Sequence, residues 1–519
     1  MPTVTLKLVV DTKRNRVVFA ESEKEFVDIL FSFLTLPMGT IIRLLNKESS
    51  VGCMDKLYMS VENLDYKCLE TVACKTMLLW PRSEAEILCE DLVVNADVLM
   101  LLWPRSEAEI LCEDLVVNAD VLMPRRLYRC PTFGCFIKNK LYSSFRGTPC
   151  LCGKAMNQYF SWIKQENNAK NSVFLKEAAT YVITDDLHVT RATTITTVSL
   201  LQNQGIEDAD VLEERIVDVG RSEVLSLLKS LLLSKMPFTD VFLQKKESVN
   251  IHKEENDIVE TAQTKSEVNN EAIQSRRIRV KVVEDKVTEE AVYAVAGNDF
   301  VDVLLSFLTF PLGSIVKLLN RQSSVVCVDN LYNSVELLAA TGDCQSSVVC
   351  VDNLYNSVEL LAATGDYIKS EECKDMLLSP KFYPHFNCDN QILKVEAKLP
   401  RTCSYRECRL RWNEMIGIFG TKCKSEKHIA YVNEINPKKP NSSTESGGGY
   451  AKRSVRFKVT NEMDVKPLSL VSEIGAIKEL NVPISSLVEK EVELGEAEVL
   501  NLLKACLVSS NPLSKLFSP

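Results

Sequence analysis

The sequence predicts an α+β fold made of two tandem, diverged copies of one domain. Long blocks of the first half recur in the second half at a nearly constant spacing, which is how a duplicated domain is recognised. Within each half, patterns typical of strands and helices follow one another without regular alternation, which favours α+β over a parallel α/β sheet. Each copy is expected to contain an N-terminal β-hairpin, helices, a Cys-rich segment and a C-terminal Leu-rich helix.

The duplication is clearest near the start of each half. Residues 26–46 read FVDILFSFLTLPMGTIIRLLN and residues 300–320 read FVDVLLSFLTFPLGSIVKLLN, with fourteen of twenty-one positions identical. Residues 223–242 and 498–517 match near the ends of the two halves. We therefore expect a first repeat unit, a polar linker without aromatic residues, and a second repeat unit, which span residues 1–243, 244–275 and 276–519.

Each unit also contains a younger, identical tandem duplication with a period of 23 residues. The first covers residues 77–122 and the second covers residues 322–366. Such identity indicates either a recent duplication or an error in the gene model. Because two copies cannot fill the same place in a packed core, we expect one copy of each pair to be extruded or poorly packed.

The first unit begins with a predicted β-hairpin over Thr3–Val10 and Arg16–Ala20, where β-prone runs flank a polar turn. Apolar residues then recur at helical spacing. Ser22 and Glu25 have the spacing of a capping box before this helix, and Pro37 predicts its end. A short helix is expected next, over residues 41–45.

The remaining elements lie further along each unit. Tyr181–Val189 and Val455–Val465 are expected to be strands. Val224–Leu232 and Val499–Leu507 form Leu-rich amphipathic patterns. Such a helix either binds a partner or packs on its own domain, and we expect the second.

Composition limits the classes of function. The net charge is −9, with 61 basic residues scattered among 70 acidic ones, so nucleic-acid binding is disfavoured and a protein partner is expected. The N-terminus alternates apolar and charged residues, unlike a signal peptide. No apolar run reaches the roughly 18 residues that span a bilayer. We therefore expect a soluble protein of the cytosol or nucleus, with reduced cysteines.

One group of cysteines has a spacing that suggests a metal site. Cys130, Cys135, Cys150 and Cys152 follow the pattern C-x4-C-x14-C-x-C. Two pairs of thiolates joined by a loop can complete a tetrahedral zinc shell, and four protein sulfurs leave no open position for water. The sequence therefore suggests a structural zinc ion here. The alternative is four reduced, partly buried thiols.

The second unit keeps only part of this pattern. Cys403, Cys408 and Cys423 retain the spacing, but Ser425 stands where the fourth cysteine would be. A second zinc site would need His428 or Cys388 as its fourth ligand. We do not expect this degenerate set to bind zinc.

Catalytic patterns are weaker. The chain has four histidines, none at a position shared by both units. The duplicated Cys53 and Cys327 therefore lack a common histidine partner and are expected to be small buried hydrophobic residues. The duplicated Asp28 and Asp302 lie early in their helices, where the helix dipole favours a carboxylate. The chain lacks a phosphate-binding P-loop, a dinucleotide motif and a nucleophile elbow.

The shared blocks resemble a known family. These blocks are FVDILFSFLTLPMGTIIRLLN, LYMSVENL, CKTMLLWPRSEAE, CLCGK at residues 150–154, and LEERIVDVGRSEVLSLLKSLLLSKMPFTDVFL. Together they are similar to the plant proteins grouped as domain of unknown function 674. The resemblance covers both halves apart from the linker and the extra tandem copies. It implies a plant origin and a duplicated domain, and it implies no activity.

These observations favour a non-enzymatic binding or scaffold protein with two related modules and a structural zinc site. One alternative is an enzyme whose site lies at the interface of the two units and uses His188 or His428. Another is a thiol-based redox sensor that uses the cysteines between Cys130 and Cys152, which would require exposed thiols of lowered pKa.

Overall fold

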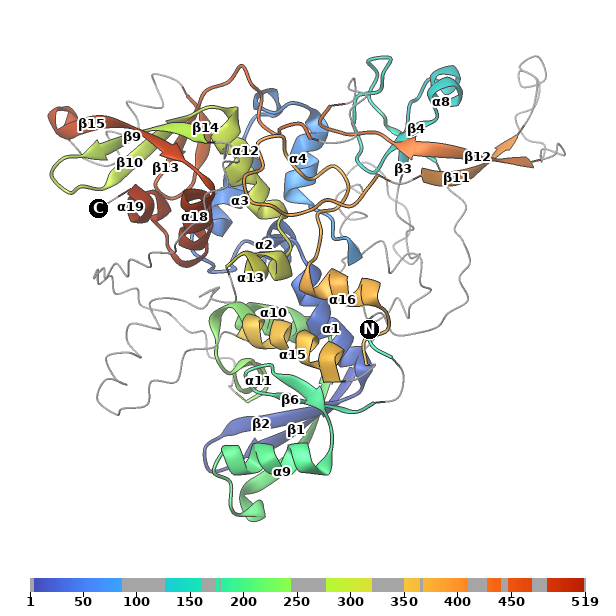
Figure 1. Cartoon of the computed structure of the whole chain (residues 1–519), viewed down its shortest axis with the longest axis vertical. Coiled ribbons are helices and arrows are strands. Elements are labelled where there is room, and N and C mark those ends of the chain that lie inside the picture. The colour runs from blue at the N-terminus through green and yellow to red at the C-terminus, as the bar shows by residue number, and fades with distance from the viewer. Residues whose placement is uncertain are drawn as a thin grey trace, which may run out of the picture.

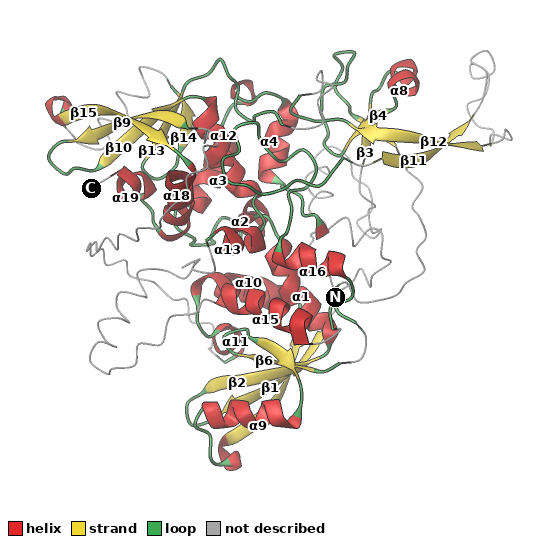
Figure 2. Cartoon of the chain, in the orientation of Figure 1, coloured by secondary structure: helices red, strands yellow, loops and turns green. Residues whose placement is uncertain are grey.

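Two five-stranded antiparallel sheets lie at opposite ends of a central helical layer (Figures 1 and 2). The computed structural model describes residues 4–85, 127–160, 174–176, 179–243, 277–319, 350–364, 367–400, 402–408, 427–439, 447–468 and 483–517. The molecule is therefore a mixed helix-and-sheet protein of the α+β class, as predicted. Within these residues no helix is long and apolar enough to cross a membrane.

The two end sheets have the same arrangement of strands. The order in the first sheet is β7 (Val189–Arg191), β6 (Tyr181–Thr184), β2 (Arg16–Ser22), β1 (Val4–Asp11) and β8 (Leu212–Val219). The order in the second is β14 (Val465–Pro467), β13 (Phe457–Thr460), β10 (Ala291–Ala296), β9 (Ile278–Asp285) and β15 (Leu487–Leu494). The predicted N-terminal hairpin is thus confirmed as β1 and β2, which pair antiparallel.

The helices of the two halves largely correspond, and most of them lie between the two end sheets (Figure 1). The first half contributes α1 (Lys24–Thr35), α2 (Met38–Leu44), α3 (Met54–Asn63), η1 (Tyr66–Cys68), α4 (Val72–Leu79), α9 (Thr194–Asn203), η2 (Ala209–Val211), α10 (Arg221–Leu233) and α11 (Pro237–Phe242). The second half contributes α12 (Asn298–Ser306), η3 (Phe307–Thr309), α13 (Leu312–Leu318), α15 (Cys350–Thr364), α16 (Glu371–Leu378), η5 (Ile484–Ser486), α18 (Glu496–Val508) and α19 (Pro512–Phe517).

The predicted capping box of the first helix is wrong. Ser22 pairs with Tyr181 in the ladder between β2 and β6. The strand therefore holds the Ser22 backbone, and the residue that caps α1 is Glu23, whose side chain makes no capping hydrogen bond. The competing strand pairing overrides the local capping signal.

The two halves meet at a reciprocal joint formed by their Pro-x-Gly segments. The Met38 N–H donates to the Phe310 carbonyl at 3.0 Å, and the Leu312 N–H donates to the Leu36 carbonyl at 3.0 Å. At Gly39 an added Cβ would lie 3.0 Å from the Leu308 carbonyl oxygen. A side chain at Gly39 would therefore press on the backbone of the other half.

The halves also exchange helices. α15 of the second half packs against α1, α10 and β7 of the first half, and α3 of the first half packs against β14 of the second. The Leu-rich helix α10 buries its apolar face, so it is not a free partner-binding helix, but part of its packing comes from the other half. One continuous apolar core runs through both halves.

Exchanged loops add paired backbone hydrogen bonds. The Lys176 N–H donates to the Tyr367 carbonyl at 2.9 Å, and the Glu70 N–H donates to the Tyr450 carbonyl at 2.9 Å. The parts of the structure that pack together therefore contain residues from both the first and the second half of the sequence.

The duplicated carboxylates of α1 and α12 anchor these exchanged loops. The Asp28 carboxylate accepts the N–H groups of Phe174 and Leu175 at 3.1 and 3.2 Å. The Asp302 carboxylate accepts those of Tyr450 and Ala451 at 2.7 and 2.8 Å. The helix dipole alone therefore does not explain these carboxylates, because the buried side chains also bind the backbone of a loop.

The described part of one copy of each tandem duplication lies in or beside the helical layer. α15 belongs to the second copy within residues 322–366, and its Tyr355 hydroxyl donates to the Leu378 carbonyl at 2.6 Å, as Tyr58 does to Leu79 at 2.8 Å. Residues 77–85 belong to the first copy within residues 77–122. The other two copies, the linker and Cys327 lie outside the described residues. What the sequence predicts for them stays a prediction.

Changing Gly52 to Ala should loosen the contact between the halves. Gly52 has a φ of +46°, and an added Cβ would lie 2.2 Å from the Cys506 carbonyl oxygen. Gly205→Ala is the matched control, because Gly205 has a φ of +65° with no atom near the added Cβ. We expect Gly52→Ala to cost about 1–3 kcal/mol more than the control. Equal thermal unfolding midpoints for the two variants would contradict this.

The buried Asp302 should give the stability a distinct pH dependence. Burial raises the pKa of this carboxyl to about 6, although backbone N–H donors partly oppose the rise. A raised folded-state pKa means that the free energy of unfolding increases as the pH falls from about 6 towards 3.8, the ordinary pKa of an aspartate side chain. The free energy of unfolding of the wild type, compared with that of Asp302→Asn, should therefore increase by on the order of 2 kcal/mol as the pH falls from 7 to 4.

Thermal unfolding of both proteins across this pH range would measure that difference. Asp210→Asn controls for the loss of an exposed carboxylate. A wild-type advantage that is the same at every pH would contradict the assignment.

Candidate metal centre

A third sheet forms a separate Cys-rich module at one side of the molecule (Figure 1). Its strand order is β11 (Thr402–Cys408), β12 (Lys427–Glu434), β4 (Leu141–Ser143), β3 (Leu127–Arg129) and β5 (Gln158–Phe160). We call residues 127–160, together with β11 and β12, the Cys-rich module. Since β12 pairs parallel with β4, both halves of the chain build it.

The module has its own small apolar core. Tyr128, Phe136 and Met156 from the first half pack with Val432 and Ile435 from the second. Two further hydrogen bonds fix this joint, since the Asn433 N–H donates to the Lys140 carbonyl at 2.9 Å and the Ile435 N–H donates to the Tyr142 carbonyl at 2.8 Å. Both halves of the chain therefore contribute to the core and to the backbone pairing of the module.

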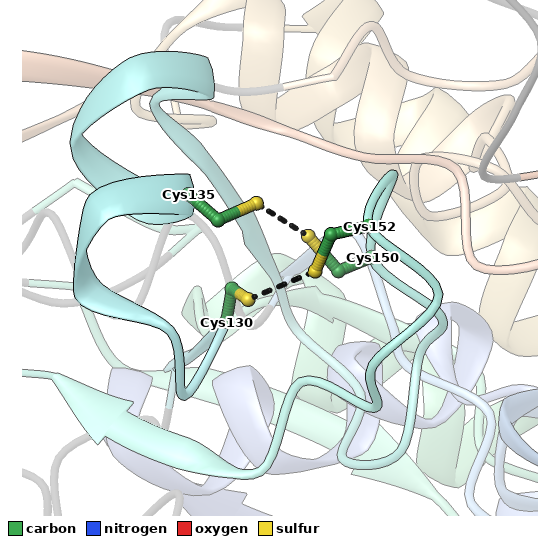
Figure 3. A group of neighbouring side chains, drawn as sticks. All are labelled: Cys130, Cys135, Cys150 and Cys152. Carbon is green, nitrogen blue, oxygen red and sulfur yellow. Dashed lines mark hydrogen bonds between the residues drawn. The ribbon is translucent and has the colours of Figure 1, made fainter.

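The four predicted cysteines converge in this module. Their sulfur atoms all lie within 4.8 Å of one another, and the Cys130–Cys152 and Cys135–Cys150 sulfur pairs are each 3.5 Å apart (Figure 3). Sulfurs at about 2.3 Å from a tetrahedral zinc ion lie on the order of 3.8 Å from one another. The four cysteines could therefore hold a metal ion after only small adjustment.

Two loops place these cysteines. Cys130 directly follows β3, and Cys135 lies in α8 (Phe133–Asn139). Cys150 and Cys152 lie on a tight turn in which the Gly153 N–H donates to the Cys150 carbonyl at 2.8 Å. Gly153 has a φ of +83°, which glycine adopts without strain. The CLCGK sequence thus forms a turn that presents two sulfurs on one side.

Hydrogen-bond donors surround the sulfurs. Asn139 Nδ2 lies 3.2 Å from the Cys135 sulfur. The Lys154 backbone N–H lowers the pKa of the exposed Cys152 thiol to about 7, whereas burial raises the pKa of Cys150 to about 12. Burial also raises the pKa of Cys130, although the Thr132 backbone N–H partly opposes this rise. Backbone donors aimed at sulfur stabilise the thiolate form that a metal needs.

The backbone around the second set of cysteines has a different conformation from the backbone around the first set. Cys403 and Cys408 lie in the extended strand β11, where residues five positions apart have Cα atoms on the order of 16 Å apart. The first half has Pro131 and Gly134 between its two cysteines, and both residues disfavour a strand. β11 has no Pro or Gly, so the strand can continue. Cys423 and Ser425 lie outside the described residues.

The two residues expected as a possible fourth ligand of the second set come from different parts of the structure. The backbone of His428 lies in β12, opposite Glu407. Cys388 is buried in the body, where its sulfur lies 3.8 Å from Lys438 Nζ.

His188 lies at the contact between the halves. Its Nδ1 is 3.4 Å from the Ser357 hydroxyl on α15. Ser357 is fully buried, donates to the Asn353 carbonyl at 2.7 Å and accepts the Val189 N–H at 2.8 Å. This serine is occupied by backbone groups and secures the exchanged helix.

Buried polar residues connect the Cys-rich module to the body, and the sequence patterns did not single them out. Glu434 on β12 accepts a hydrogen bond from Ser144, whose hydroxyl lies 3.3 Å from that of Tyr383. Arg82 Nη2 donates to the Ser144 carbonyl at 3.3 Å. Near them, burial lowers the pKa of His385, while the charge of Glu434 raises it. In the sequence, these buried residues are distinguished only as polar residues next to apolar ones.

Comparisons with known proteins identify the family. A family model described as "Protein of unknown function (DUF674)" matches residues 1–99, 98–348 and 338–497. No curated protein and no solved structure matches the chain. The matched segments cover most of the sequence, and they agree with the resemblance inferred from its repeated blocks. The chain therefore belongs to the DUF674 family of proteins of unknown function.

Proposed function

We propose that this protein is a non-enzymatic binding or scaffold protein whose Cys-rich module is held together by one structural zinc ion. The convergence of four sulfurs within 4.8 Å carries this proposal. The module has a small apolar core, and small domains of this kind commonly rely on a metal for stability. Zinc suits an all-cysteine set, because it binds four thiolates without redox chemistry.

A structural role fits the positions of the ligands better than a catalytic one. Cys130 and Cys150 are buried, while Cys135 and Cys152 are partly and fully exposed. With all four bound, zinc would have no open position for a substrate or water. The metal would instead tie β3 and α8 to the turn that precedes β5.

Metal content of the purified full-length protein tests this proposal. We expect about one zinc per chain in the wild type and less than a tenth of that in a Cys150→Ser/Cys152→Ser variant, because two ligands are lost. Cys68→Ser is the control, since Cys68 lies outside the cluster. The first half alone would be a poor test, because it lacks β12.

Each result has a direct meaning. Zinc that is lost only from the cluster variant, together with protection of residues 127–160 from proteolysis, supports the structural site. A correctly folded wild type without bound metal overturns it. Reversible disulfide formation within the four cysteines of that metal-free protein would instead favour the thiol-based redox sensor.

We also propose that the two halves are diverged copies that exchange α3 and α15 across a pseudo-twofold axis. The matching strand orders and the reciprocal Pro-x-Gly hydrogen bonds support this. It predicts that a chain split within residues 244–275 and co-expressed as two fragments will assemble as a one-to-one complex. Independent folding of each fragment as a stable monomer would contradict the exchange. Size-exclusion chromatography with light scattering separates these outcomes.

A further inference from the structure

The first-half part of the Cys-rich module differs in charge from the chain as a whole, whereas β11 and β12 contain both acidic and basic residues. Residues 127–160 contain five basic residues and no Asp or Glu, although the whole chain has a net charge of −9. Lys138, Lys140, Arg146 and Lys154 are exposed. Within the described part of the molecule, these four side chains form no ion pair. Because phosphate binding depends on the local field, a clustered surface can bind anions on an acidic protein.

An exposed apolar side chain lies between the two cysteines of each pair, at the start of α8 in the first and in the tight turn in the second. Phe133 follows the first cysteine of its loop by three positions and is 39 % exposed. Leu151 lies between Cys150 and Cys152 and is 48 % exposed. The contact between the Cys130 and Cys152 sulfurs brings these loops side by side (Figure 3). We call Arg129, Phe133, Leu151 and Lys154 the loop face.

Cations adjoin the aromatic ring of this face. The Arg129 guanidinium carbon lies 5.7 Å from the centre of the Phe133 ring. Lys154 Nζ lies 3.0 Å from the hydroxyl of Thr132, the residue before Phe133. An exposed ring with neighbouring cations offers a stacking surface for a base and charge for its phosphates. Base stacking on an aromatic side chain contributes about 1–3 kcal/mol.

We propose that the loop face binds single-stranded nucleic acid. A duplex keeps its bases stacked on one another, whereas a single strand can place a base on Phe133 and its phosphates near Lys154. The low overall charge of the chain disfavoured such binding, but that argument averaged the module with acidic sheets and helices. This inference rests on the proposed zinc ion only in that the metal would hold the two loops together.

Fluorescence anisotropy with the full-length, zinc-loaded protein tests the inference. The probes are labelled oligouridine, labelled oligothymidine and labelled polyglutamate, each at low and physiological salt. We expect binding to one or both oligonucleotides, weakened by salt, and the comparison of the two shows whether RNA or DNA is preferred. Phe133→Ala should weaken binding at least about fivefold, because a stacking partner is lost. Lys154→Glu should weaken it and reduce its salt dependence.

Matched substitutions elsewhere control for these effects. Ile195→Ala removes an apolar side chain that is 80 % exposed on α9, and Lys13→Glu reverses an exposed charge in the β1–β2 turn. Neither should change binding. The zinc content of every variant is measured in parallel. This distinguishes weaker binding caused by loss of the metal from weaker binding caused by loss of the substituted side chain.

The outcomes separate the two proposals. Weaker oligonucleotide binding in Phe133→Ala with zinc retained supports the loop face. A zinc-loaded wild type that binds neither oligonucleotide, or binds polyglutamate alone, overturns the inference and leaves the structural site intact. Binding that is unchanged in both Phe133→Ala and Lys154→Glu also overturns it. A wild type that lacks both zinc and oligonucleotide binding overturns both proposals.

Discussion

The reciprocal contact between the two Pro-x-Gly segments is the constraint on which the rest of the structure depends. Backbone hydrogen bonds connect Met38 with Phe310 and Leu312 with Leu36, so neither segment can move without the other. Proline holds each entering chain extended, and glycine permits the close backbone approach. α1, α13, α15 and α16 then pack around this joint. The Pro and Gly are therefore kept in both halves for a reason of backbone geometry.

The exchange of helices that follows from this joint explains how a buried carboxylate can be useful in an apolar core. Asp28 and Asp302 each lie on a helix whose neighbours are almost all hydrophobic. Each binds two backbone N–H groups of a loop that pairs with the opposite half. The two N–H donors offset part of the cost of removing each carboxylate from water. The carboxylates thus secure the segments that bind one half to the other.

The two halves contribute different elements to the Cys-rich module. The first half supplies the cysteine loops, and the second supplies strands that complete the sheet beneath them. Pro131 and Gly134 turn the chain where the corresponding stretch of the second half continues as β11. One copy could therefore keep a set of metal ligands while the other became structural support. The Cys-rich module is thus an asymmetric feature beside two end sheets that share one strand order.

The sequence by itself determined the elements that depend on local pattern. Alternating residues specified the hairpin of β1 and β2, helical spacing specified α1, and cysteine spacing identified Cys130, Cys135, Cys150 and Cys152. The tertiary structure alone decided that Ser22 belongs to a strand, that Asp28 and Asp302 hold loops, and that α3 and α15 each contact elements of the opposite half. These features depend on contacts between residues far apart in sequence. Local periodicity carries no information about such contacts, because the free energy of packing is gained only when distant segments meet.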